Sequence, residues 1–185
     1  MMKLSYLAFK KGLAFMLLCL STVLVKAQTD TTYRHLPATR EKIPLYIISP
    51  NIIGGGDAVN VNDVKSLNVL KDHAVTPPFK NLDKYGVIII TLKETIKVDT
   101  KSFNDIKLWL NIKGEVDFAV DGFFIDDKSL LIATASINEI NVIKKNPQNK
   151  LANTVINIWT LEPGTRKGFV PPPPGAGKPG EIYIR

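Results

Sequence analysis

Cysteine is almost absent from this chain of 185 residues, which carries a single one, Cys19. A lone cysteine excludes an internal disulfide and a cysteine-rich metal site. The two histidines, His35 and His73, stand in no metal-ligand spacing with each other or with an acidic cluster. The hydrolase motifs Gly-x-Ser-x-Gly and His-Glu-x-x-His are missing as well. We therefore expect no enzyme activity, no metal and no cofactor, with an enzyme whose site is dispersed along the sequence as the alternative.

Long hydrophobic runs are also scarce. The uncharged, mostly apolar stretch 12–25 has 14 residues, fewer than the roughly 17–25 that a membrane-spanning helix needs. Lysines within residues 3–11 precede this stretch, and Val25-Lys26-Ala27 suits a cleavage site before Gln28. This layout is typical of a secretory signal peptide, with an uncleaved anchor or a lipidated Cys19 as alternatives. We expect an exported protein, periplasmic or outer-membrane associated, with no transmembrane segment in the mature chain.

The apparent basicity of the chain, +7 at neutral pH, comes largely from this leader. The leader holds four of the 24 Lys and Arg residues and none of the 17 acidic ones, so the mature net charge is about +3. The remaining charges are mixed rather than clustered. We therefore expect no nucleic-acid partner.

The sequence falls into segments of different composition. "SFNDIKLWLNIKG" offers Ser102 as a helix N-cap and Gly114 as a stop, although its alternation also allows a strand. After residue 163, four consecutive prolines and "GAGKPG" indicate a stiff and then flexible tail. The predicted segments are a signal peptide (1–27), a flexible arm (28–43), a first unit (44–96), a connecting helix (97–115), a second unit (116–162) and a Pro/Gly-rich tail (163–185).

One apolar pattern occurs twice. "DVKSLNVLKDHA", from Asp63, returns as "SINEINVIKKN", from Ser136, at a constant offset of 73. Strong strand patterns close both halves, "GVIIITLK" and "NTVINIWTL", at an offset of 68. The second half also holds a tight-turn dipeptide, Asp121-Gly122. We interpret the spacing as an internal duplication, with chance similarity of strand-rich sequence as the alternative.

The first copy resembles the plug domain of TonB-dependent outer-membrane receptors. The resemblance covers residues 44–93 and, loosely, 116–161. The matching residues of the middle element are Asp63, Val64, Ser66, Leu67, Val69, Leu70, Lys71 and Asp72, and those of the closing strand are Tyr85, Gly86, Val87, Ile88, Ile90, Thr91 and Lys93. The second copy keeps Val120-Asp121-Gly122 but has Asn157 and Trp159 where the closing strand of the family has branched residues.

The resemblance implies an α+β fold of two tandem plug-like β-α-β units with short strands and helices. In the family, the plug lies inside a β-barrel and gates nutrient uptake. The 24 residues after residue 161 are too few for a barrel of even 8 strands of about 9–11 residues each. We therefore expect a non-catalytic plug-like binding module, partnered by an outer-membrane or other envelope protein and serving an outer-membrane receptor or TonB-dependent transport system.

The last residues offer a second hypothesis. The terminal "EIYIR" alternates like a strand, and such a strand can add to the sheet edge of a partner. The candidate partner-binding residues are Glu181, Ile182, Tyr183, Ile184 and Arg185. The alternative function is that of a secreted structural or adhesion protein that associates through exposed strands, and a disordered tail is the simpler interpretation of the same residues.

Overall fold

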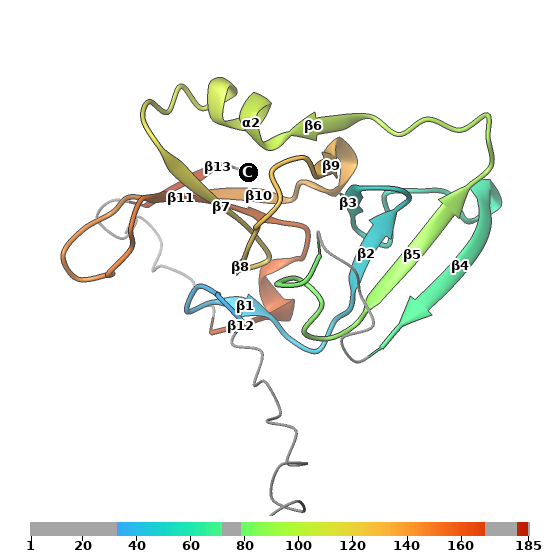
Figure 1. Cartoon of the computed structure of the whole chain (residues 1–185), viewed down its shortest axis with the longest axis horizontal. Helices are drawn as coiled ribbons and strands as arrows, with labels where there is room; N and C mark the ends of the chain where they lie inside the picture. Colours follow the sequence, from blue (N-terminus) through green and yellow to red (C-terminus); the bar gives the residue numbers. More distant parts are fainter. Residues whose placement is uncertain (1–32, 72–78, 169–180, 185) are drawn as a thin grey trace, which may run out of the picture. The chain divides into compact units, whose positions relative to one another are not determined.

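The computed structural model describes residues 33–71, 79–168 and 181–184. They form a mixed α+β fold that is mostly β-sheet, with one α-helix, α2 (Phe103–Trp109), in the described part (Figure 1). The mixed α+β class agrees with the sequence prediction at this level. The predicted signal peptide and His73 lie outside the described residues. Within the described ranges, no helix has the length and apolar character needed to cross a membrane.

A six-stranded sheet contains most of the described strands from the first half of the chain. Its strands lie in the order β4-β5-β2-β3-β9-β6. They are β2 (Leu45–Ile48), β3 (Ile52–Gly54), β4 (Val64–Leu70), β5 (Val87–Leu92), β6 (Thr100–Ser102) and β9 (Leu131–Ala133). The sequence of β5, "VIIITL", is rich in β-branched residues, which pack well on a pleated surface. It pairs in parallel with β2 and antiparallel with β4.

A five-stranded sheet contains most of the second half, in the order β13-β10-β11-β7-β8. Its strands are β7 (Val116–Val120), β8 (Phe123–Phe124), β10 (Glu139–Ile143), β11 (Thr154–Trp159) and β13 (Glu181–Ile184). The hairpin between β7 and β8 turns at Asp121 and Gly122, whose φ angles are 48° and 82°. Two successive positive φ values are the requirement of the tight turn that the dipeptide predicts.

The strand order of the two sheets is the same over four strands. β4-β5-β2-β3 corresponds to β10-β11-β7-β8, and each pair of neighbours has the same relative direction in both sheets. The pairing of Leu67 with Ile90 returns as Ile140 with Ile158, which matches the offsets of 73 and 68. The β2 and β7 strands differ by one residue from this alignment, because Leu45 pairs with Val87 whereas Phe118 pairs with Ile156.

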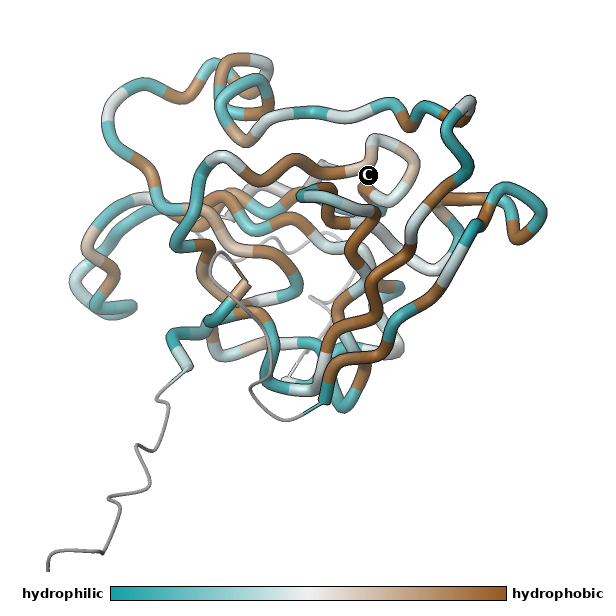
Figure 2. Tube along the Cα trace, turned by 45° about the vertical axis from the view of Figure 1, so that its right-hand side comes forward, coloured by the Kyte–Doolittle hydropathy of each residue, from teal (hydrophilic) through white to brown (hydrophobic). Residues whose placement is uncertain are grey.

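The two halves share a sheet and a core. β9, from the second half, pairs in parallel with β3 and antiparallel with β6, so it lies inside the six-stranded sheet. A single cluster of buried apolar side chains draws on both halves, from Leu45 to Ile158. Hydrophobic residues follow the strands, and hydrophilic residues concentrate in the connections (Figure 2). The predicted boundary at residues 97–115 therefore separates stretches of sequence that fold onto each other.

The α2 helix begins where its sequence predicts. The Ser102 hydroxyl accepts a hydrogen bond from the Asp105 backbone N–H at 3.1 Å, and the Asp105 carboxylate accepts one from Ser102 N, which completes a capping box. The helix ends at Trp109, well before the predicted stop at Gly114, because Asn111 adopts a positive φ of 53° and interrupts the helical path. Phe103 faces the core, where its ring lies 5.3 Å from that of Phe118.

The described end of the predicted flexible arm is packed instead of free. Leu36 N–H donates to Gly122 O at 2.7 Å, and Arg40 N–H donates to Asp121 O at 2.9 Å. β1 (Thr39–Arg40) pairs antiparallel with β12 (Arg166–Lys167), so the start of the predicted tail is also part of the fold. The polar composition of both segments does not predict this packing. The two segments are held by hydrogen bonds to backbone groups that are distant in the sequence, and not by a periodic pattern of apolar residues.

The Gly122 position yields a stability prediction. A Cβ atom there would overlap the Ala38 carbonyl oxygen and lie 2.8 Å from Thr39 Cα, whereas at Gly114, with the same φ of 82°, a Cβ would meet nothing within 4 Å. We expect Gly114→Ala to lower the free energy of unfolding by about 1 kcal/mol, the cost of the backbone conformation. Gly122→Ala should cost about 3 kcal/mol or more, since it adds a clash with backbone. Urea unfolding of both variants measures the difference, and equal losses would contradict the packing of residues 36–40 on this turn.

Candidate functional site

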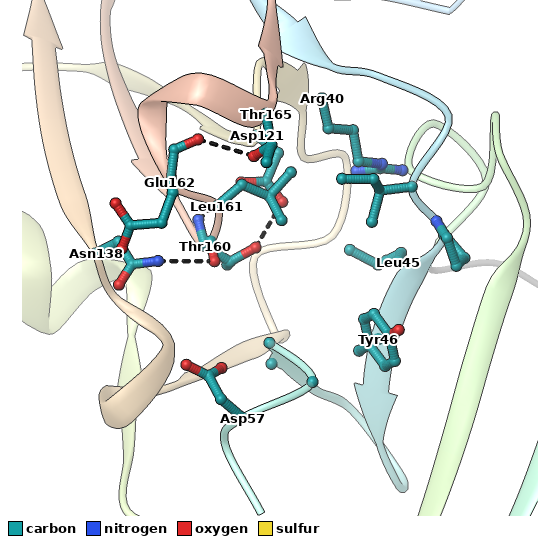
Figure 3. Close-up of a pocket in the computed structure, with 15 residues that line it drawn as sticks. Arg40, Leu45, Tyr46, Asp57, Asp121, Asn138, Thr160, Leu161, Glu162 and Thr165 are labelled. Atoms are coloured by element: carbon teal, nitrogen blue, oxygen red, sulfur yellow. Dashed lines mark hydrogen bonds between the residues drawn. The ribbon is translucent and has the colours of Figure 1, made fainter.

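A cavity of about 290 Å³ lies between β2 with the glycine-rich loop on one side and the β7–β8 turn with the end of β11 on the other (Figure 3). Both halves of the chain contribute to its wall. The polar and glycine residues that line it are Arg40, Tyr46, Gly54, Gly55, Gly56, Asp57, Asp121, Asn138, Thr160, Glu162 and Thr165. This cavity is the candidate site because it combines buried charges with an open side.

Arg40 is the most unusual of these residues, since a charged side chain is only 1% exposed. Its Nη2 donates a hydrogen bond to the Leu82 carbonyl oxygen, and its guanidinium lies 4.7 Å from the centroid of the Phe123 ring. Among the described residues, neither Nε nor Nη1 has a hydrogen-bond partner. Burial lowers the pKa of Arg40, while the nearby charge of Asp121 acts in the opposite direction.

Asp121 is buried on the same wall and is held by a single neighbour. Its Oδ1 accepts a hydrogen bond from Thr160 N–H at 2.7 Å, and its Oδ2 accepts one from Thr160 Oγ1 at 2.8 Å. Burial raises the pKa of Asp121, and the Arg40 charge and the Thr160 hydrogen bonds only partly oppose this effect. Burial is thus the largest influence on the pKa of both groups. This is expected for two charges that attract each other without forming a direct ion pair.

The turn that carries Asp121 is fixed from several directions. Gly122 N–H donates to the Asn157 side-chain oxygen at 3.0 Å, and Asp121 N–H donates to Ile158 O at 2.9 Å. Asn157 is itself fully buried in β11. This contact gives the buried Asn157 a structural role, because its side chain forms a hydrogen bond to the turn.

A second buried charge pair lies beside the first. Arg166 Nη1 donates to Glu139 Oε2 at 2.9 Å, with both side chains almost fully buried. The same guanidinium donates to Leu161 O through Nε and Nη2, and it lies 4.3 Å from the Trp159 ring centroid. These contacts bind the chain that follows β11 to the five-stranded sheet.

Phe123, whose ring contacts Arg40, is also surrounded by further aromatic rings. Tyr33 and Tyr85 meet Phe123 edge-on, with ring centroids 6.4 and 6.2 Å away, and His35 lies at 5.9 Å. Tyr33 donates a hydrogen bond to Asp83 at 3.0 Å. Burial, with the Asp83 carboxylate, raises the pKa of Tyr33 to about 12. His35 therefore belongs to this aromatic cluster.

The glycine-rich loop, residues 54–56, lines one side of the cavity. Gly55 N–H donates to Ser136 Oγ at 2.7 Å, so a residue of the second half orders this loop. Asp57 and Glu162 add carboxylates to the wall. The arrangement can hold a small polar group through hydrogen bonds, and the described residues hold no group of three His, Cys, Asp or Glu side chains that could bind a metal ion.

The residues predicted to bind a partner do not line this cavity. Glu181–Ile184 form β13, which pairs antiparallel with β10 of the same chain, and Arg185 lies outside the described residues. Other acidic residues of the second half have contacts elsewhere: Asp126 pairs with Arg34 of the N-terminal segment, and Asp127 accepts a hydrogen bond from the nearby Ser129 N–H.

Sequence reasoning missed Arg40 and Arg166. Both stand in polar stretches without periodicity, where an arginine normally faces solvent. The only sequence signal near the site was the Asp121-Gly122 turn. No family model, curated protein or solved structure matches this chain.

The Glu139–Arg166 pair gives a prediction for stability. Glu139→Leu leaves the Arg166 charge buried without its carboxylate, so we expect a loss of about 3–5 kcal/mol in the free energy of unfolding. The double variant Glu139→Leu/Arg166→Met removes both charges and should be more stable than the single variant. Denaturant unfolding tests both, and a double variant less stable than Glu139→Leu would contradict this account.

The pKa of Asp121 gives a prediction for pH dependence. Because burial raises this pKa in the folded state, the folded protein binds the proton more tightly than the unfolded chain does. The stability from this group is therefore present below the ordinary Asp value of 3.8 and is lost as the pH rises through the raised pKa. Asp121→Asn keeps an acceptor for Thr160 N–H and a donor for its hydroxyl. We expect the unfolding free energy of the wild type, relative to Asp121→Asn, to fall as the pH rises above 3.8, as measured by denaturant unfolding across pH. A constant difference would show that burial does not dominate at Asp121.

Proposed function

We propose that this chain is an exported, non-catalytic binding module made of two plug-like units, which binds an envelope protein and serves an outer-membrane receptor or TonB-dependent transport system. The observation that carries this proposal is the repeated strand order, β4-β5-β2-β3 and β10-β11-β7-β8. Repetition of order and direction supports a duplication more strongly than similar apolar patterns do, since strand order is independent of composition.

The positions of the plug-like motif residues in the structure support the proposal that the first unit is plug-like. Asp63 ends a short 3-10 turn and Val64 begins β4, as the family pattern of a helical turn leading into a strand implies. Gly86 precedes β5 with a φ of 84°, and a Cβ there would lie 3.0 Å from Leu70 O. A glycine is required at this position because a side chain would press against the neighbouring strand. The motif residues thus have structural reasons for their spacing.

The buried charges support a binding function over a catalytic one. Both oxygens of Asp121 accept hydrogen bonds from Thr160, and the Arg166 guanidinium contacts Glu139 and Leu161. Groups that are occupied in this way stabilise the junction of the two sheets. On this proposal, the leader directs the chain to the envelope, and recognition of the partner uses the outer surface of the paired units.

The second candidate function is structural association through exposed strands, with residues 181–185 as the donated strand. It is favoured by the position of β13, which lies at the edge of its sheet and is joined to β12 by residues 168–180. Thirteen residues of chain span at most about 43–47 Å when fully extended. Exchange of this strand between molecules is therefore possible on length alone.

The experiment is in-cell crosslinking and pull-down of the full chain from the envelope fraction. We expect a barrel receptor or a TonB-type energiser to be recovered by the wild type. A matched variant lacking residues 169–185 tests the tail: retained capture places the contact on the plug-like units, and lost capture places it on the terminal strand. Recovery of the chain alone, or of cell-surface polymers, would overturn the transport proposal in favour of the structural one.

A further inference from the structure

A hollow separates part of α2 from the five-stranded sheet. The helix lies over one face of this sheet (Figure 1), and it packs on β7 through the rings of Phe103 and Phe118. Towards β10, two cavities of about 390 and 630 Å³ lie between the helix with its following loop and the sheet. Both volumes are in the range of small-molecule binding sites.

Trp109, the last residue of α2, lines both cavities and therefore stands between them. Its side chain is 67% exposed, whereas a tryptophan is highly buried in most proteins. The neighbouring Leu108 is equally exposed, at 67%, but lines neither cavity. An apolar ligand in the hollow would therefore cover Trp109 and leave Leu108 in contact with water.

Apolar side chains form most of the lining of this hollow, which we call the α2 groove. They include Ile106, Trp109, Leu110, Ile112, Ile140 and Val142. The last two are two residues apart on β10, so they point to the same face of the sheet and form a common floor. The five residues of β10 span about 16 Å of extended chain. An elongated apolar floor suits a hydrocarbon chain, because burial of apolar surface is the main source of affinity for such a ligand.

The two ends of the α2 groove differ in charge. At one end, Lys101 is accompanied by two carboxylates, those of Asp105 and Glu139. The cavity at the other end has Lys144 and Lys145 in its wall and no acidic residue among its described lining residues. Neither of these two lysines forms a salt bridge within the ranges that the structure describes. Two ammonium groups at one end of an apolar groove are complementary to a ligand with one negative head group.

We propose that the α2 groove binds a fatty acid, with its hydrocarbon chain along β10 beside Trp109 and its carboxylate at Lys144 and Lys145. The lysines favour an anionic amphiphile over a neutral apolar molecule, and the apolar lining favours it over a small anion. A free amphiphile is favoured over a membrane because the lining residues lie within a hollow, whereas a bilayer presents a flat surface. The inference rests on this groove alone and stands apart from the proposed function.

The test is calorimetric titration of the purified full chain with dodecanoate, below its micelle concentration and at low salt. We expect saturable binding at one site. Dodecyltrimethylammonium has the same chain and the opposite charge, and it should bind about tenfold or more weakly. Tryptophan fluorescence of the wild type should shift to shorter wavelength as dodecanoate binds. The shift would report on Trp109, because the other tryptophan, Trp159, is already buried at 1% exposure.

A matched pair of variants tests the apolar part of the site. Trp109→Ala should weaken the binding of dodecanoate about tenfold, since it removes the largest apolar side chain of the groove. Leu108→Ala changes an equally exposed residue of the same helix and should leave the dissociation constant unchanged. Far-UV circular dichroism checks that both variants fold.

A second pair of variants tests the head-group site. Lys144→Glu/Lys145→Glu should weaken dodecanoate binding about tenfold at low salt and strengthen the binding of dodecyltrimethylammonium. Lys80→Glu/Lys128→Glu makes the same change in net charge at two exposed lysines that do not line the groove. This control should leave both affinities unchanged.

Four results would overturn the proposal. They are the absence of saturable dodecanoate binding, equal affinity for the two amphiphiles, an equal loss in Trp109→Ala and Leu108→Ala, and binding without a fluorescence shift. Co-sedimentation with phosphatidylglycerol vesicles covers the membrane alternative: capture by vesicles without binding of free dodecanoate would identify a membrane-binding surface instead. Pull-down of an envelope partner bears only on the proposed function, so the two proposals can fail separately.

Discussion

The hydrogen bonds around the Asp121-Gly122 turn hold this structure together. The turn receives the N-terminal segment through Leu36 and Arg40, and β11 through Asn157 and Ile158. The Asp121 carboxylate adds the chain after β11 through Thr160. Two segments that are far from the turn in sequence, residues 36–40 and 157–160, therefore converge on these two residues. Gly122 is the position at which this convergence leaves no room for a side chain.

Burying Arg40 and Asp121 at this junction has a cost, which the surrounding contacts offset. Each charge loses hydration that the other restores only in part, as the opposite directions of their pKa changes indicate. The aromatic ring of Phe123 and the Thr160 hydrogen bonds supply the remaining stabilisation. Polar groups that demand specific partners also restrict how the two sheets can pack, since an alternative arrangement would leave them without hydrogen bonds.

Local features were predictable from the sequence, and long-range features were not. The β-branched run of β5, the Asp121-Gly122 turn and the Ser102 cap follow from neighbouring residues alone. The predicted end of α2 was too late because Asn111 adopts a left-handed conformation. Asparagine tolerates this conformation, but an asparagine in the sequence does not predict it. Arg40 and Arg166 were missed because their burial depends on backbone and side chains 42 and 27 residues away. The cavity could not be predicted for the same reason, since its wall is assembled from both halves.

The insertion of β9 between β3 and β6 bears on the timing of folding. During synthesis, the N-terminal half emerges with one edge of β3 uncovered, because its neighbour β9 consists of residues 131–133. The pair of Thr39 and Lys167 forms later still, because most of the chain lies between the two residues. Contacts between such distant residues slow folding, because a long loop must be ordered before they form. A chain built in this way completes its sheets only when nearly all of it is present.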